Sequence, residues 1–246
     1  MPKQLDIAVD GVTLRVRVWP AVDTARRPVV LLPATGETGE GWDVVAMSLH
    51  SSRTVHAVNL RGHGSSDWPG HYSIQAMADD VTGLLRRLGD RPVDLVGHSL
   101  GGLVACTIAS ANPELVQRLV LEDVGMPHTR PAAAPPRPPG VLSFDWRVVE
   151  QVRPETDDPD PRWSDVVARI PAPTLVIAGG PSSPVPQDHI AELVRTVPDG
   201  RLVTVDAGHL VHATRPDEFV HHLLTFLDAQ SPIAERSPTR NPRVAG

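Results

Sequence analysis

The chain has 246 residues, of which 41% are hydrophobic and 21% charged, and this is typical of one globular domain with a well-buried core. Its formal net charge is −6, which argues against nucleic acid as a partner, and no segment approaches the ~20 apolar residues of a membrane span. Cys106 is the only cysteine, so no intramolecular disulfide can form, and residues 1–10 lack the apolar core of a signal peptide. We expect a soluble cytoplasmic protein, monomeric or homodimeric.

Short apolar runs alternate with helical patterns along the chain. The first two runs read as an antiparallel hairpin, and the later ones are continuously apolar, which indicates strands buried on both faces of a parallel sheet. Strands are predicted at Leu5–Val9, Thr13–Trp19, Val29–Leu32, Thr54–Leu60, Val93–Val96, Leu119–Leu121, Thr174–Ala178 and Leu202–Val205. Helices are predicted at Gly41–His50, Ile74–Leu88, Ser99–Ala111, Gln187–Val197 and Pro216–Ala229.

The segment between the sixth and seventh predicted strands is too long for a single crossover. Its first part, Met126–Gly140, is rich in proline and is expected to be an extended, partly mobile loop. Its second part carries Phe144, Trp146 and Trp163, which we expect to roof an apolar substrate pocket from a small helical lid. The predicted organisation is a core formed by residues 1–123 and 171–229, a loop and lid at 124–170, and a disordered tail at 230–246.

The most informative motif is G-x-S-x-G at residues 97–101. It follows an apolar strand and precedes a helical stretch, which is the setting of a nucleophile elbow. Gly97 and Gly101 allow a tight turn that holds the Ser99 hydroxyl clear of the sheet. The helix N-terminus behind it favours developing negative charge. The sequence therefore predicts Ser99 as a catalytic nucleophile.

A serine needs a nearby base to act as a nucleophile at neutral pH. Among eleven histidines, His209 stands in a Gly-His loop directly after the last predicted strand, where it would overhang the edge of the sheet that carries Ser99. His212 is expected to support the site or begin a helix, and His98 to point sideways from the elbow. We predict that His209 is the base.

Besides the elbow, the chain carries an R-G-H-G-S-S loop at Arg61–Ser66 and an A-G-H segment at Ala207–His209. In these motifs it resembles the α/β-hydrolase superfamily, over residues 5–229. The resemblance implies an α/β-hydrolase fold, with an eight-stranded, mostly parallel sheet flanked by helices and a lid inserted after strand six. It also implies the chain order nucleophile, acid, histidine, which Ser99 and His209 satisfy.

Two segments depart from the family pattern. Where the family usually carries His-Gly after strand three, this chain has Pro33-Ala34, and the position that matches the oxyanion donor is Thr35. The backbone N–H groups of Thr35 and Leu100 are the predicted oxyanion hole.

The second departure concerns the acid of the triad. Ser182 stands where many members carry an aspartate after strand seven. Some members supply the acid from the end of strand six, where this chain has Glu122 and Asp123. Successive strand residues point to opposite faces, so only one of the two could face the histidine. We favour Glu122, with Asp123 as the alternative.

The predicted function is hydrolysis of a carboxylic ester or lactone of a small to medium apolar molecule through an acyl-enzyme. The same scaffold could serve a thioesterase, a C–C hydrolase or an acyltransferase. A ligand-binding receptor with a vestigial triad is the alternative of another class, because the acid after strand seven is missing. The sequence shows no metal-ligand spacing and no phosphate-binding loop, so no metal and no cofactor are expected.

Overall fold

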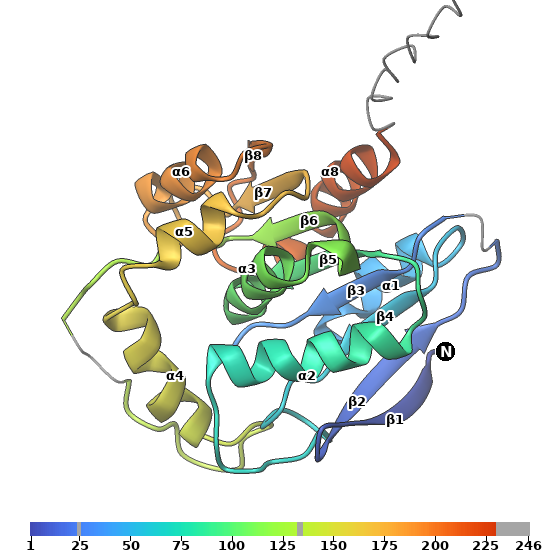
Figure 1. Cartoon of the computed structure of the whole chain (residues 1–246), viewed down its shortest axis with the longest axis horizontal. Helices are drawn as coiled ribbons and strands as arrows, with labels where there is room; N and C mark the ends of the chain where they lie inside the picture. The colour runs from blue at the N-terminus through green and yellow to red at the C-terminus, as the bar shows by residue number, and fades with distance from the viewer. Residues whose placement is uncertain (24–25, 132–134, 230–246) are drawn as a thin grey trace, which may run out of the picture.

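The computed structural model describes residues 1–23, 26–131 and 135–229. Eight strands form one sheet in the order β1-β2-β4-β3-β5-β6-β7-β8 (Figure 1). The strands are β1 (Lys3–Val9), β2 (Val12–Trp19), β3 (Val29–Leu32), β4 (Val55–Val58), β5 (Val93–His98), β6 (Val116–Glu122), β7 (Thr174–Ala178) and β8 (Gly200–Thr204). β2 is antiparallel to both of its neighbours, β1 and β4, and all other pairs are parallel.

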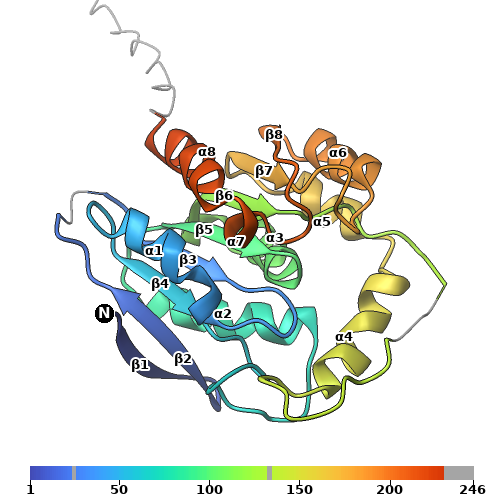
Figure 2. The same ribbon diagram turned by 180° about the vertical axis from the view of Figure 1, so that it is seen from behind.

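Helices cover both faces of this sheet. They are α1 (Asp43–Leu49), α2 (Ile74–Arg87), α3 (Leu100–Ala111), α4 (Arg147–Asp157), α5 (Trp163–Ala168), α6 (Gln187–Thr196), α7 (Val211–Thr214) and α8 (Pro216–Asp228), with two 3₁₀ turns at Gly39–Trp42 and Pro113–Leu115. One face carries α2, α3, α5 and α6, and the other carries α1 and α8 (Figures 1 and 2). The expected fold class, an eight-stranded and mostly parallel sheet flanked by helices, is confirmed.

The alternation along β3 shows why the strand is apolar throughout. Val29 and Leu31 belong to the core cluster under α1 and α8, whereas Val30 and Leu32 belong to the cluster under α2 and α3. All four side chains are fully buried. A strand that packs against helices on both faces needs an apolar residue at every position.

The segment between β6 and β7 contains the expected helices. The described part of 126–140 contains neither helix nor strand, in agreement with its proline content. α4 stands beyond the carboxyl ends of the parallel strands, and α5 packs against α3 and α6 (Figure 1). The disordered tail predicted at 230–246 lies outside the described residues.

In the described part of the chain, no helix is both long and apolar enough to cross a bilayer.

Candidate active site

The turn between β5 and α3 has the geometry of a nucleophile elbow. Ser99 has φ +50° and ψ −115°, and residues other than glycine seldom adopt a backbone conformation with such a positive φ. A Cβ atom on Gly97 would lie 2.4 Å from the carbonyl oxygen of Gly101, so only glycine permits the close approach of strand and helix. Ser99 stands at the N-cap position of α3 without a side-chain capping bond, and the first N–H groups of a helix have no acceptor within it.

The elbow also lies directly against the end of β3. A Cβ atom on Gly101 would come within 2.6 Å of the carbonyl oxygens of Leu32 and Pro33. This contact sets the start of α3, and with it Leu100, beside the loop that carries Thr35. Thr35 is exposed and Leu100 is buried. The predicted oxyanion donors therefore belong to two segments in contact, and their role stays a prediction.

The acid that contacts His209 is Asp123. Its Oδ2 atom lies 2.6 Å from His209 Nδ1, and Asp123 is buried while 31% of the His209 side chain is exposed. Our preference for Glu122 is therefore corrected, because Glu122 contacts a different histidine. Asp123 is held from two further sides, since Gly179 N donates to Oδ1 at 2.8 Å and the Ser183 hydroxyl donates to Oδ2.

The backbone of Asp123 explains the error. The rule that successive residues face opposite ways applies to extended strands, but β6 ends at Glu122 and Asp123 has φ +50°. This left-handed turn re-aims the carboxylate toward the loop that carries His209. Both acids can therefore reach a histidine at the same edge of the sheet.

Ser182, at the position where many family members have an aspartate, takes no part in this contact. It is exposed, and its hydroxyl donates to Asp206 Oδ1 at 2.7 Å. In this segment the side chain that bonds to Asp123 is that of the neighbouring Ser183, beside the backbone N–H of Gly179. The sequence offered no signal for Ser183, because one serine of a Ser-Ser pair cannot be told from the other without the loop geometry.

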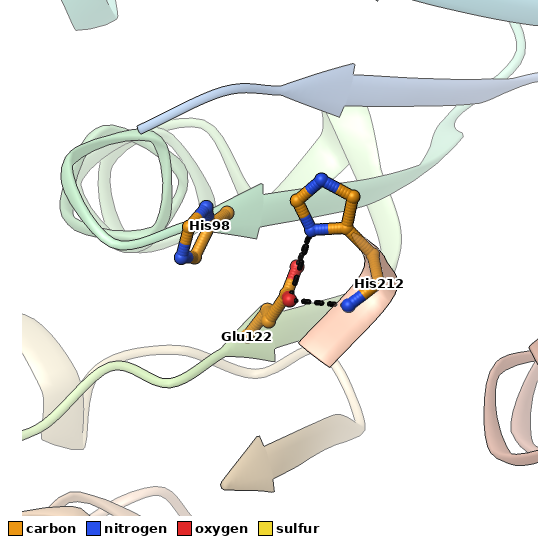
Figure 3. A group of neighbouring side chains, drawn as sticks. All are labelled: His98, Glu122 and His212. Atoms are coloured by element: carbon orange, nitrogen blue, oxygen red, sulfur yellow. Dashed lines mark hydrogen bonds and ion pairs between the residues drawn. The ribbon is translucent and has the colours of Figure 1, made fainter. Parts of the chain in front are cut away.

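A second acid–histidine pair lies beside the first. Glu122 accepts from His212 Nδ1, with its two carboxylate oxygens at 2.9 and 2.8 Å, and from the backbone N–H of His212 at 2.8 Å (Figure 3). Both side chains are buried, and the His212 ring stacks on Trp42 with 4.2 Å between ring centroids. This pair anchors the start of α7 to the end of β6.

His98 completes a compact group of imidazoles. Its ring centroid lies 4.6 Å from that of His209 and 5.4 Å from that of His212. Its Nδ1 atom lies 3.0 Å from Glu37 Oε2. Burial disfavours the charged imidazole, but the carboxylates of Glu122 and Glu37 outweigh it and raise the pKa of His98 above its ordinary value.

His98, Glu122 and His212 are also the group best placed to hold a metal ion among the described residues. Their ligand atoms lie within 4.8 Å of one another, and histidine with carboxylate suits Zn²⁺ (Figure 3). Sequence spacing did not reveal this group, because its members come from three separate segments. The Glu122 carboxylate is already bound by His212, so hydrogen bonds account for its oxygens without an ion.

The predicted substrate-binding aromatics separate into two groups. Phe144 and Trp146 line a surface depression of about 480 Å³, together with Trp68 and Val141. Trp163 instead packs half-buried against the hydrophobic core and does not line this depression.

Phe144 connects the depression to the Thr35 loop. A Cβ atom on Gly36 would lie 3.0 Å from the Phe144 ring, and Ser143 Oγ donates to the carbonyl of Gly36 at 3.1 Å. The Phe144 ring also stacks on His63 of the R-G-H-G-S-S loop, with 5.6 Å between centroids. The depression therefore begins next to the segment that carries the predicted oxyanion donor.

α4 is fastened to the loop that precedes α2. Tyr72 donates from its hydroxyl to Asp145 Oδ2 at 2.8 Å and from its backbone N–H to Gln151 Oε1 at 2.8 Å. Glu155 accepts from the backbone N–H of Ile74, the first residue of α2, at 3.1 Å. These bonds attach the predicted lid, which includes α4, to the loop before α2 and to the first residue of α2.

Comparisons with known proteins agree with the fold. Residues 27–167 match the family model of the alpha/beta hydrolase fold. The chain is 29% identical to the sn-1-specific diacylglycerol lipase ABHD11 of Mus musculus over 74% of each chain. It is 30% identical to the putative carbamate hydrolase RutD of Pseudomonas savastanoi pv. phaseolicola over 82% of this chain and 94% of that protein. A solved hydrolase from Pseudomonas aeruginosa superposes with a TM-score of 0.78 at 26% identity, covering 93% of this chain and 98% of the other. The chain belongs to the α/β-hydrolase family.

Proposed function

We propose that the protein is a serine hydrolase that cleaves a carboxylic ester or lactone through an acyl-enzyme. The observation that carries this proposal is the 2.6 Å contact between Asp123 and His209 beside a nucleophile elbow at Ser99. The receptor alternative rested on a missing acid, and the contact of Asp123 with His209 supports the hydrolase instead. Relatives named as a lipase and as a putative esterase/lipase support hydrolysis at an acyl carbon.

The proposal assigns a role to each group. His209 takes the proton of Ser99 as Ser99 attacks the carbonyl carbon, and Asp123 holds the imidazole in the tautomer with its proton on Nδ1. The N–H groups of Thr35 and Leu100 bind the negative oxygen of the tetrahedral intermediate. His209 then protonates the leaving alcohol and activates the water that releases the acid.

The depression beside Phe144 suggests where the substrate lies. Trp68, Val141, Phe144 and Trp146 give it an apolar lining, while charged side chains of Arg137, Arg147 and Glu150 stand at the same site. An apolar acyl or alcohol group placed there would extend away from the Thr35 loop. We propose a small to medium apolar substrate, under a roof formed by residues 142–146 and α4.

The test is turnover of p-nitrophenyl acetate and butyrate by the wild-type protein and by Ser99→Ala. We expect the substitution to lower kcat by at least about 10⁴-fold, because the nucleophile and its base act as one unit. Ser182→Ala is the matched control, since this exposed serine follows β7, at the edge of the sheet where the parallel strands end, and its hydroxyl bonds only to Asp206 among the contacts described.

A second measurement identifies the attacking atom. A fluorophosphonate should add one phosphonyl group, at Ser99, as read by mass spectrometry of the digested protein. Turnover that Ser99→Ala leaves intact would refute the proposal. So would a wild-type protein that the fluorophosphonate does not label.

A further inference from the structure

A part-buried contact between a carboxylate and an imidazole joins the nucleophile elbow to the loop after β3. Glu37 Oε2 lies 3.0 Å from His98 Nδ1, although the two residues are 61 positions apart in the chain. His98 is fully buried and directly precedes Ser99, whereas 26% of the Glu37 side chain is exposed. The pair therefore fixes the distance between the two segments that carry the proposed nucleophile and one proposed oxyanion donor.

Glu37 also closes the turn in which it stands. Its backbone N–H donates to the carbonyl of Ala34 at 3.1 Å, and its Oε2 accepts from the N–H of Ala34 at 3.1 Å. Thr35 and Gly36 are the central residues of this four-residue turn, and Gly36 has φ +82°, as the third position of a type II turn requires. One carboxylate thus sets the shape of the turn and ties it to His98.

The pKa shifts of Glu37 and His98 agree with an attractive contact between the two side chains. Burial would raise the pKa of Glu37, but the hydrogen bond and the charge of His98 outweigh it and hold this pKa below its ordinary value. The pKa of His98 moves in the opposite direction, with Glu122 as a second carboxylate partner. Both directions favour a glutamate that is ionised and an imidazole that is protonated.

We propose that Glu37 and His98 are positioning residues, which hold the Thr35 N–H in the place where the oxyanion forms relative to Ser99. Neither residue touches the reacting atoms; they act through the turn and the elbow. The inference rests on the proposed function and explains how an oxyanion loop without the family's usual His-Gly is kept rigid. Preorganised donors stabilise a transition state because they need no reorganisation when charge develops.

The test compares Glu37→Gln with Glu40→Gln. Glutamine keeps the size of the side chain but removes the charge that holds His98. Glu40 lies three residues further along, and its contact is the exposed ion pair with Arg17 at 3.3 Å. We expect Glu37→Gln to lower kcat about 10²-fold, within the range for loss of one oxyanion donor, with KM changed less than threefold. Glu40→Gln should match the wild type in both constants.

If Glu37 only stabilised the fold, its substitution would lower the melting temperature and the number of active sites but not kcat per active site. Both are therefore measured, by calorimetry and by active-site titration, and kcat is expressed per active site. Butylboronic acid forms a tetrahedral adduct with a serine hydroxyl, and its Kd should rise by the same factor as kcat falls. His98→Gln gives the test from the other side of the pair if Glu37→Gln folds poorly. The double variant should be no slower than the worse single variant.

The rate of fluorophosphonate labelling at Ser99 separates this inference from the proposed function, because labelling displaces fluoride from phosphorus and cleaves no carboxylic ester. If the wild type is labelled but cleaves no ester, the substrate class is wrong and a slower labelling of Glu37→Gln still supports the positioning role. If Glu37→Gln keeps kcat, boronate affinity and labelling rate within threefold of the wild type, the positioning role is refuted. A wild type that is not labelled refutes both.

Discussion

The pairing of two adjacent acids with two different histidines makes a sharp prediction about catalysis. Asparagine at position 123 can still accept from Gly179 N through its oxygen, but it presents an NH₂ group to His209 Nδ1. That donor favours the tautomer with the proton on Nε2, which cannot take a proton from Ser99. In a serine protease the same change lowers kcat about 10⁴-fold. We expect a similar loss for Asp123→Asn, or about 5.5 kcal/mol of transition-state stabilisation.

The neighbouring substitution, Glu122→Gln, should behave differently. Glu122 and His212 form a buried pair, and breaking such a pair costs stability, with values of about 3–5 kcal/mol when one partner is removed outright. Its kcat per active site should fall less than about tenfold, because the Asp123–His209 contact remains. We therefore expect a lower melting temperature with most of the activity retained.

The assay is kcat for p-nitrophenyl butyrate, corrected by active-site titration, beside the melting temperature of each variant by calorimetry. The assignment of the acid is refuted if folded Glu122→Gln loses more kcat than folded Asp123→Asn. It is also refuted if Asp123→Asn keeps more than a tenth of the wild-type rate.

Three further predictions concern the elbow, the substrate and the stability. Gly97→Ala should yield little folded, active protein, because its Cβ would lie 2.4 Å from the backbone oxygen of Gly101; circular dichroism and labelling yield test this, and a normal yield contradicts it. Trp146→Ala should lower kcat/KM for butyrate more than for acetate, by up to about 0.8 kcal/mol for each of the two additional CH₂ groups; equal losses would place the acyl chain elsewhere. Burial lowers the pKa of His56 to about 4 from 6.5, so its contribution to stability is present above pH 6.5 and is lost as the pH falls toward 4. Between these pH values the wild type should lose about 3 kcal/mol more unfolding free energy than His56→Gln in urea titrations, and parallel losses would refute the shift.

The sequence predicted those features that a local pattern determines. The elbow follows from glycines two residues on either side of Ser99, because their missing side chains permit the contact of strand and helix. The doubly buried strands follow from continuous apolar runs. His209 was placed at the correct edge because the carboxyl ends of parallel strands share that edge.

Features that depend on a turn or on distant segments were missed. The choice of acid failed because it assumed an extended backbone at Asp123, where φ is +50°. The Glu37–His98 pair joins residues 61 positions apart, and no spacing rule connects them. Trp163 was assigned to the pocket because it is aromatic, but it packs against the core. Aromatic side chains occur in both surroundings, so residue type alone could not decide between them.

The register of β5 and β6 explains why an acid from β6 can replace one from the segment after β7. The pairing aligns His98 with Glu122, the last residues of β5 and β6, so Ser99 and Asp123 are the first residues after two adjacent strands. Each leaves the sheet through a left-handed turn, with φ +50° in both cases, and Ser99 N still donates to the carbonyl of Glu122 at 3.1 Å. The proposed nucleophile and the proposed acid therefore follow two strands that lie side by side in the sheet. His209, from the loop after the edge strand β8, needs only to reach across this edge, and its 2.6 Å contact with Asp123 shows that it does.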